Sequence, residues 1–537
     1  MSDQTDTLGG RLPLADRTDR HRLPHRHLSL GVREAHHVRD TRARIGILTM
    51  NFASLPDRRA DLDPNGPAVS DETRSLTNAG LLERVRAARR HLHELGVGAG
   101  DVVALKLRNR VEFVVLLFAC WRLGATVTPI NPSLTDAEVT LQLQASGARL
   151  LVVEVGAIGP GGVATLAVGN LYAKGPGWDG PPVVDPSALA LLIFTSGTTG
   201  VPKGVMLDHA NLGAMAEMGR QALHIGSTDR CLLILPLFHV NGIVVSVLMP
   251  LLAGASVIIT EKFDPHTFFE TVEHHRPTFF SGVPTIYTML AALPDEVVPD
   301  TSSVRFGICG AAPASAELLA RFEARYGFPL IEGYGLSEGT CASTVNPVDG
   351  ERRAGTVGIA FPGQQIRVVD AAGGEVPAGV DGAVLIAGPN VMRGYLGRPD
   401  EAARVIVDGW LHTGDIGHLD AQGYLTLVGR SKDMIIRGGE NIYPKEIEDV
   451  LTGDPTVLEA AVIGVPDDKW GETVAAYVQP RPGRVINPEA LHALCARKLA
   501  GYKRPTTITV MDAIPKNAVA KTDKAPLRAA HLRGPSR

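Results

Sequence analysis

Predicted helices and predicted strands alternate along most of this chain, and this alternation limits its fold more than any other feature. An amphipathic helix is expected at 81–96, a strand at 101–107, a buried helix at 111–124 and another strand at 125–131. The alternation continues past residue 300. Such a pattern favours largely parallel sheets with helices packed on their faces. We therefore predict an α/β protein.

The length of the chain, 537 residues, predicts two or more domains, because a single hydrophobic core stops growing well below that size. Near residue 360 the pattern changes to short strands separated by turns, which predicts a small β subdomain. A compact α+β segment is expected after Arg430. The predicted parts are an N-terminal domain over 50–430, a hinge at 431–432 and a C-terminal domain over 433–537.

Two segments have an unusual composition. Residues 1–49 are rich in Arg and His, contain no Lys and show no sustained apolar period. They predict a disordered leader rather than a metal site or a signal peptide, and the true start could be Met50. Residues 155–184 are rich in Gly and Pro and predict a surface connection.

Composition also bears on partners and compartment. The stretch 231–260 contains no Asp, Glu, Lys or Arg, but Pro, His, Asn and Gly interrupt it. A strand, a buried helix and a second strand fit it better than one membrane-spanning helix.

Five scattered cysteines without a Cys-x-x-Cys pair favour a reducing compartment, and we predict a cytoplasmic protein. A net charge of −4 argues against non-specific binding of nucleic acid.

A loop rich in glycine and hydroxyl groups, FTSGTTGVPKGV at 194–205, is the first candidate site. It follows a predicted buried strand at 188–194 and precedes a predicted helix at 210–219. Glycines, hydroxyls and then Lys203 form the pattern of a phosphate cradle, although a flexible linker is an open alternative. It is no Walker loop, because Gly204 stands where that motif needs a hydroxyl for magnesium.

Polar residues further along the chain suit a nucleotide. In IEGYGLSEGT (331–340), Tyr334 could stack on a base. Ser337 could hold a phosphate oxygen, and Glu338 could hold a magnesium ion. The alternative is that this segment is an ordinary polar loop. Asp415, between glycine turns, could accept hydrogen bonds from two ribose hydroxyls, and Arg430 could donate to the same ribose. The basic segment 514–528, read alone, would be a solvated tail.

Taken together and in this order, these segments resemble the adenylate-forming acyl-CoA synthetase family. That family includes fatty-acyl-CoA and aryl-CoA ligases, luciferases and the adenylation domains of peptide synthetases. The resemblance covers residues 50–530 and implies a large N-terminal domain of two α/β sheets plus a β subdomain. It also implies a small mobile C-terminal domain, and a loop at 194–204 that closes over the triphosphate of ATP.

The resemblance assigns a role to each candidate residue. The phosphate loop would comprise Thr195, Ser196, Gly197, Thr198, Thr199, Gly200 and Lys203. The nucleotide would be held by Gly310, Ala311, Ala312 and Tyr334 at adenine, by Asp415 and Arg430 at ribose, and by Ser337 and a magnesium ion on Glu338 at the phosphates. The catalytic residues would be Lys203, Glu338, His239 and Lys521. His239 would lie beside the substrate carboxylate, and Lys521 would bridge that carboxylate and the α-phosphate. The hinge would be Lys432, and Gly438, Gly439 and Glu440 would line the pantetheine tunnel.

His239 has an alternative interpretation, and Ala520 departs from the pattern of the family. His239, read alone, would more often be a satisfied core histidine. The family usually has Gly immediately before the last catalytic lysine, whereas this chain has Ala520. If that turn needs a positive φ, alanine strains it by roughly 1 kcal/mol.

The predicted function is an ATP-dependent acyl-CoA ligase that uses ATP, Mg²⁺ and coenzyme A. It would activate a carboxylic acid as acyl-AMP with release of pyrophosphate, and then transfer the acyl group to coenzyme A. The stretches 238–248 and 281–290 contain no arginine to pair a second carboxylate. We therefore expect a fatty acid, with an aryl acid as the other candidate, rather than malonate. An acyl-AMP ligase that loads a separate carrier protein, a luciferase-type oxygenase and a non-catalytic nucleotide sensor remain alternatives, and the sequence leaves the oligomeric state open.

Overall fold

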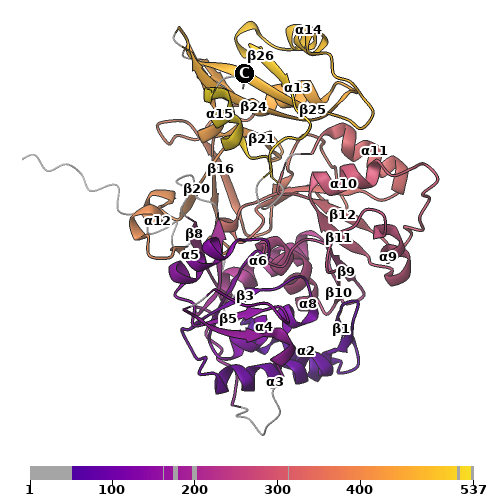
Figure 1. Cartoon of the computed structure of the whole chain (residues 1–537), viewed down its shortest axis with the longest axis vertical. Helices are drawn as coiled ribbons and strands as arrows, with labels where there is room; N and C mark the ends of the chain where they lie inside the picture. Colours follow the sequence, from indigo (N-terminus) through magenta and orange to yellow (C-terminus); the bar gives the residue numbers. More distant parts are fainter. Residues whose placement is uncertain are drawn as a thin grey trace, which may run out of the picture.

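The computed structural model describes residues 51–160, 162–172, 180–195, 202–312, 314–438, 440–467, 469–516 and 521–533. The predicted leader at 1–49 lies outside the described residues. Two large sheets with their helices form the lower and middle parts of the molecule in Figure 1, a smaller β part lies beside α10 and α11 in the middle, and a C-terminal sheet lies at the top.

A seven-stranded sheet contains the strands that flank the candidate phosphate loop. Its order is β18-β8-β7-β4-β3-β5-β6, with parallel pairing from β7 to β6 and antiparallel pairing of β8 with β7 and β18. The strands are β3 (Val102–Lys106), β4 (Thr126–Pro129), β5 (Leu150–Val153), β6 (Ala164–Ala167), β7 (Leu189–Thr195), β8 (Lys203–Asp208) and β18 (Gly394–Tyr395). Strand β6 lies inside the segment that we predicted to be only a surface connection. All its residues pair with residues of the apolar strand β5.

A nine-stranded sheet has the order β15-β14-β13-β12-β11-β9-β10-β1-β2 and is parallel from β13 to β1. Its strands are β1 (Pro67–Ser70), β2 (Ser75–Thr77), β9 (Arg230–Leu233), β10 (Ser256–Ile259), β11 (Phe279–Gly282), β12 (Phe306–Cys309), β13 (Leu330–Tyr334), β14 (Thr344–Val345) and β15 (Ile359–Ala360). Helical segments over 240–252 connect β9 to β10, which confirms the strand–helix–strand prediction for 231–260. Among the described residues, no helix has the length and apolarity needed to cross a membrane.

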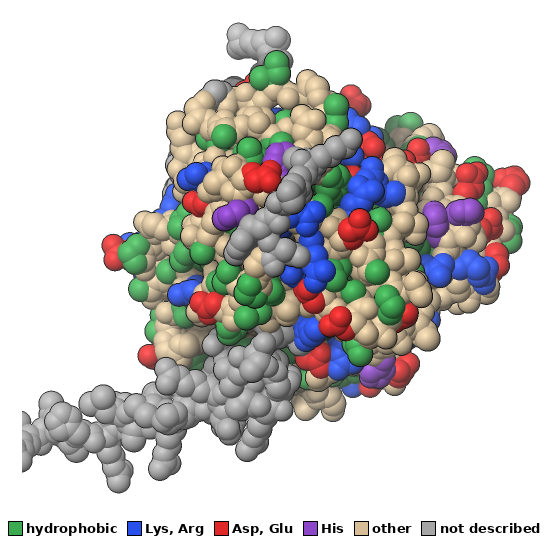
Figure 2. Space-filling model, turned by 90° about the horizontal axis from the view of Figure 1, so that it is seen from below, with side chains coloured by type: hydrophobic (Ala, Val, Ile, Leu, Met, Phe, Trp, Pro, Cys, Tyr) green, Lys and Arg blue, Asp and Glu red, His purple; other side chains and the backbone are tan. Residues whose placement is uncertain are grey.

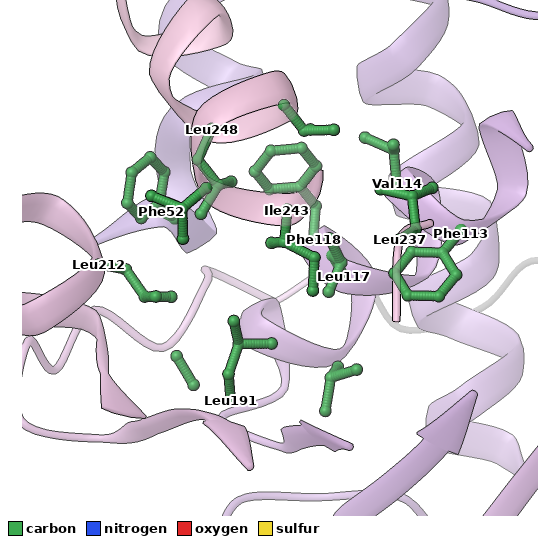
Figure 3. Packing of buried hydrophobic residues seen from close by; sticks show 14 of the residues in the cluster. Phe52, Phe113, Val114, Leu117, Phe118, Leu191, Leu212, Leu237, Ile243 and Leu248 are labelled. Carbon is green, nitrogen blue, oxygen red and sulfur yellow. The ribbon is translucent and has the colours of Figure 1, made fainter. Parts of the chain in front are cut away.

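One hydrophobic core joins the two sheets. Helix α4 (Val111–Arg122) is buried along its whole length, because nearly all its residues are apolar. Phe113, Phe118 and Leu117 from α4 point toward Leu237 and Ile243 from the β9–β10 connection (Figure 3). The remaining helices of these two layers are α2 (Leu55–Leu62), α3 (Asn78–Glu94), α5 (Asp136–Ser146), α6 (His209–Ala222), α9 (Phe268–His275), α10 (Pro284–Ala291) and α11 (Ala316–Tyr326).

Acidic and basic side chains are interspersed on the face seen from below (Figure 2). This face carries α2 and α3, and Arg86 of α3 pairs with Asp57 of α2 at 3.2 Å. The two helices are therefore linked by charge as well as by packing.

A β subdomain of antiparallel strands follows the two large sheets in the sequence. They are β16 (Gln365–Val369), β17 (Gly382–Ala387), β19 (Ile406–Val407), β20 (Trp410–Leu419) and β21 (Leu425–Arg430). The short helix α12 (Pro399–Val405) precedes β19. This is the β subdomain expected from the change of pattern near residue 360.

The C-terminal part has a sheet and cores of its own. Its elements are β22 (Ile435–Arg437), β23 (Glu440–Ile442), α13 (Pro444–Thr452), β24 (Val457–Asp467), β25 (Gly471–Pro480), α14 (Pro488–Lys498), β26 (Thr507–Val510) and α15 (Lys524–Arg533). The two hydrophobic clusters here draw their buried members only from residues 435–527, and the other clusters draw theirs only from residues before 430. The predicted fold class, two α/β sheets with a β subdomain and a separate α+β part, is confirmed.

Candidate active site

The candidate site begins at the carboxyl ends of three adjacent strands. Strands β11, β12 and β13 are parallel neighbours that end at Gly282, Cys309 and Tyr334. The backbone N–H of Gly310 donates to the carbonyl of Gly282 at 3.2 Å, which ties the loop after β12 to the end of β11. Ligands of open α/β sheets bind at this edge. The loops that carry Ala311 and the 337–340 turn therefore start where a ligand is expected.

The predicted adenine loop has a special backbone conformation. Ala311 has φ +67°, in the left-handed region that residues with a Cβ rarely adopt. Ala311 and Ala312 are exposed, whereas Tyr334 is only 8% exposed. A short exposed backbone beside a buried ring could receive a flat base.

Two carboxylate contacts organise the predicted ribose site. Asp415 on β20 and Arg430 at the end of β21 are partners in the β20–β21 ladder. Arg430 Nε lies 2.6 Å from Asp415 Oδ1, and the Tyr334 hydroxyl donates to Asp415 Oδ2 at 2.5 Å. Burial raises the pKa of Asp415, while the charge of Arg430 and the bond from Tyr334 oppose that rise. The β20–β21 register thus pairs Asp415 with Arg430, and Tyr334 at the end of β13 joins them, so that three of the predicted nucleotide residues form one hydrogen-bonded group.

Lys203 is placed differently from the expectation. It is the first residue of strand β8, opposite Thr195 of β7, rather than a loop residue. Its ammonium group forms an ion pair with Glu401 and lies 5.3 Å from the centre of the Tyr395 ring. The Tyr395 hydroxyl in turn donates to Glu338 Oε1 at 2.9 Å. Tyr395 therefore connects the predicted phosphate lysine to the predicted magnesium ligand.

The charges of this group also act on Lys521 of the C-terminal part. Although Lys521 retains exposure to solvent, the surrounding protein desolvates its ammonium group and lowers its pKa. Arg430 lowers the pKa of Lys521 further, while the charges of Asp415 and Glu338 raise it. Charged residues from three separate sequence motifs thus affect the pKa of Lys521.

His239 lies close enough to Lys521 to be affected by its charge. Burial, followed by the charge of Lys521, lowers the pKa of His239 to about 4. The imidazole is therefore neutral at pH 7. Its ring packs against Phe238 with 4.4 Å between the ring centres.

The remaining predicted residues lie outside this group. Lys432 is an exposed residue of the 3₁₀ turn Ser431–Asp433. Gly438 has φ +60°, donates its N–H to the Trp470 carbonyl, and a Cβ there would lie 2.8 Å from the Trp470 ring, so glycine fits where larger residues would not. Glu440 begins β23. Other predicted residues lie outside the described residues: Ser196, Gly197, Thr198, Thr199, Gly200, Gly439 and Ala520.

Two exposed aromatic rings on the C-terminal part were missed by the sequence analysis. Trp470 is 43% exposed and Tyr502 is 38% exposed. Arg437 links them, since its guanidinium lies 5.8 Å from the Trp470 ring and donates to the Tyr502 carbonyl at 2.8 Å. Lys469 lies 4.8 Å from the Trp470 ring, and Lys503 lies 5.7 Å from the Tyr502 ring. Each ring stands beside a lysine in the sequence, which is the signal that could have drawn attention to them.

Glu332 is a buried carboxylate directly behind the adenine loop. It is 4% exposed, and its Oε1 accepts the Ala314 N–H at 3.1 Å. Its Oε2 is buried and has no hydrogen-bond partner among the described residues. Burial raises the pKa of Glu332 to about 7, opposed by the Ala314 N–H and by Lys445.

We expect Glu332→Gln to raise the free energy of unfolding by up to about 3 kcal/mol at pH 8, and by less than about 1 kcal/mol at pH 5. Between about pH 4.5 and 7 the folded protein keeps a proton on Glu332 that the unfolded chain releases, so the stability of the wild type falls as the pH rises through this window. Glutamine retains the acceptor oxygen and carries no charge. Urea unfolding at the two pH values measures the difference, and an equal gain at both would contradict the assignment.

Comparison with known proteins identifies the family. The sequence model of AMP-binding enzymes matches residues 56–396, and that of the AMP-binding enzyme C-terminal domain matches residues 446–521. The chain belongs to the AMP-binding enzyme family. The predicted resemblance to adenylate-forming enzymes is thereby confirmed.

Three relatives show how far the likeness extends. Feruloyl-CoA synthase of an Amycolatopsis species is 38% identical over 486 residues, which cover 89% of this chain and 98% of that protein. Indoleacetate–CoA ligase of Aromatoleum aromaticum is 36% identical over 503 residues, with the same two coverages. The solved structure of o-succinylbenzoate coenzyme A synthetase from Bacillus subtilis, in complex with ATP and magnesium ion, has a TM-score of 0.81 and 30% identity, and the match covers 89% of this chain and 98% of that one. None of these names a fatty acid, so the expected fatty-acid substrate gains no support from them.

Proposed function

We propose that this protein is an AMP-forming acid–CoA ligase. A carboxylate oxygen of the substrate attacks the α-phosphorus of ATP and pyrophosphate leaves; the thiol of coenzyme A then attacks the acyl-AMP carbonyl and AMP leaves. The observation that carries the proposal is the hydrogen-bonded group of Tyr334, Asp415 and Arg430. The charges of Asp415, Arg430 and Glu338 also act on Lys521 of the C-terminal part. We infer domain boundaries close to 50–430 and 433–537.

The first step needs charge neutralisation rather than a general base. A carboxylic acid is already ionised at pH 7, so its oxygen is a ready nucleophile. Lys521 would lie between the carboxylate and the α-phosphate and stabilise the charge that gathers there. The neutral imidazole of His239 adds no competing charge beside the acid.

Glu338 would hold the magnesium ion. Magnesium in nucleotide sites takes one or two carboxylates together with substrate phosphates, so a single carboxylate fits. The Tyr395 hydroxyl bonds to one oxygen of Glu338 and orients the carboxylate. When bound, the ion would neutralise charge on the phosphates; Lys203 and Ser337 would contact the same phosphates.

The second step would use the C-terminal part. Gly438, Gly439 and Glu440 would line the path of the pantetheine arm. The exposed rings of Trp470 and Tyr502, with Arg437, Lys469 and Lys503 beside them, suit a flat base that carries phosphates. Coenzyme A has such a nucleotide end, which supports it over a carrier protein as the acceptor.

For the acid, we propose an aromatic carboxylate as the first candidate and a medium- or long-chain fatty acid as the second. Ferulate, indoleacetate and succinylbenzoate, the acids named for the three relatives, are aromatic. Asn241, two residues after His239, accepts a hydrogen bond from Ser281 at 3.2 Å. This polar pair near an otherwise apolar stretch could accept a polar substituent on a ring.

A panel of acids tests the proposal. Pyrophosphate release and thioester formation are measured with ferulate, indoleacetate, 2-succinylbenzoate, octanoate and malonate in the presence of ATP, magnesium and coenzyme A. We expect pyrophosphate and thioester with at least one aromatic acid. Pyrophosphate without thioester would favour a carrier protein as acceptor, and neither product with any acid would contradict the ligase.

We infer a cytoplasmic location from the cysteines. None of the five, Cys120, Cys231, Cys309, Cys341 and Cys495, forms a disulfide among the described residues, and four are buried. Reduced, scattered thiols suit a reducing compartment.

We expect Lys432→Pro to preserve pyrophosphate release on the first turnover and to lower thioester formation by tenfold or more. Lys521 and the segment Gly438–Glu440 would serve different steps at one site, so the C-terminal domain must change orientation between them. Proline fixes φ near −65° and hinders that change. Single-turnover kinetics measures both steps, with Lys432→Ala as the control that removes the side chain and keeps the backbone free. Normal rates for both steps in the proline variant would place the hinge elsewhere.

A further inference from the structure

Glu401 holds two cations at the start of strand β8. It lies in helix α12, none of whose residues is buried, yet its carboxylate forms ion pairs with Lys203 and with Arg398 at 3.3 Å. The side chains of Lys203 and Glu401 are 16% and 28% exposed, so the first pair is shielded from much of the solvent.

The chain around Glu401 is fixed to β8 by several contacts. Strand β18 pairs with β8 at Tyr395 and Val205, which places the Tyr395 ring beside the Lys203 ammonium. Arg398 also donates to the Pro202 carbonyl at 3.3 Å. Helix α12 and β8 lie side by side in Figure 1 although 198 residues separate Lys203 from Glu401 in the sequence. The carboxylate is therefore held opposite the lysine by the fold.

From this geometry we infer that Glu401 competes with the phosphates of ATP for Lys203 and so sets the affinity for the nucleotide. The inference rests on the proposed function, which gives Lys203 to the phosphates. Lys203 cannot pair fully with a carboxylate and a polyphosphate at once, so nucleotide binding must weaken the pair with Glu401. The lysine and Arg398 lower the pKa of Glu401, which keeps it ionised at neutral pH.

The expected gain on removing the competitor is modest. A partly exposed ion pair is worth little in water, which corresponds to a change of about fivefold at most. We therefore expect Glu401→Gln to lower the Kd of magnesium-ATP by about three- to fivefold. The exposed neighbour Asp400 offers a matched control, since Asp400→Asn changes the net charge equally one residue away.

The experiment is calorimetric titration of the full chain with magnesium-ATP in the absence of any acid. We expect tighter binding for Glu401→Gln, and for Glu401→Ala as a second variant, with Asp400→Asn close to wild type. In the Lys203→Met background, Glu401→Gln should give no gain, because the cation for which it competes is gone.

The outcomes separate this inference from the function. Unchanged or weaker binding of magnesium-ATP in both Glu401 variants would overturn the competition. An equal gain in affinity in Asp400→Asn would also overturn it. So would a gain from Glu401→Gln that persists in the Lys203→Met background. If the wild type shows no binding of ATP that depends on Lys203, the proposed phosphate role itself fails.

Discussion

Replacement of Lys521 with alanine is expected to slow acyl-AMP formation by about two to three orders of magnitude, the scale for loss of one preorganised charge at a transition state. The charges of Arg430, Asp415 and Glu338 act on the Lys521 ammonium group, and charge on the α-phosphate would develop near these residues. Transfer of the acyl group from supplied acyl-AMP to coenzyme A should change little, because that step would not use Lys521. Pyrophosphate release measures the first step, and thioester formation from synthetic acyl-AMP measures the second.

A lysine from the same domain provides the control. Lys498 is exposed on α14, so Lys498→Ala removes an equal charge without touching the site. It should leave both steps unchanged. Equal losses in both steps for Lys521→Ala would mean that the lysine supports the fold rather than the first reaction.

Asp415→Asn is expected to lower the rate of both half-reactions by about a hundredfold at subsaturating nucleotide. Both oxygens of Asp415 are engaged, one by Arg430 and one by the Tyr334 hydroxyl, and the residue is 4% exposed. An amide would turn an N–H₂ group toward one of these donors. Hydrogen bonds to charged groups contribute roughly 1.5–3 kcal/mol each, so weakened contacts to the ribose suffice for the loss. Acyl-AMP carries the same ribose as ATP, which is why both steps should suffer.

The variant Tyr334→Phe tests the same group with a smaller expected loss. It removes the hydroxyl that bonds Asp415 and keeps the ring, so the loss should stay below about tenfold. The two half-reactions are measured as for Lys521, together with the Kd of AMP. An Asp415→Asn variant that slowed only the first step would show that Asp415 acts on pyrophosphate departure and not on the ribose.

Local patterns in the sequence were sufficient to predict an α/β protein with a β subdomain and a C-terminal α+β part, whereas the two sheets of the large domain were expected from the family resemblance. The apolar residues of α4 and of the β9–β10 connection determine the central core, and the alternation of elements follows from the same residues. The motif residues Tyr334, Asp415, Arg430 and Lys521 were chosen from sequence. The structure joins the first three by hydrogen bonds, and the charges of Asp415 and Arg430 act on Lys521. Their roles stay predictions.

Contacts between distant segments could not be predicted in this way. Nothing local in the sequence links Lys203 to Glu401, or Glu338 to Tyr395, because strand pairing of β18 with β8 creates both contacts. Pairing of β8 with β7 extends β8 to Lys203, opposite Thr195, which is why that residue is not in a loop. The pKa of Glu332 likewise depends on burial by neighbouring elements, which no single segment reveals.

The separation of the hydrophobic cores has a consequence during synthesis of the chain. The candidate nucleotide contacts Lys203, Tyr334, Asp415 and Arg430 all precede the C-terminal part, whereas Lys521 is translated afterwards. At typical rates of translation, roughly five to twenty seconds pass between Arg430 and Lys521. A nascent chain could therefore fold its first domain and bind ATP while still unable to consume it. Because a ligand that binds only folded protein stabilises it, cellular ATP would act in that interval as a folding aid before it becomes a substrate.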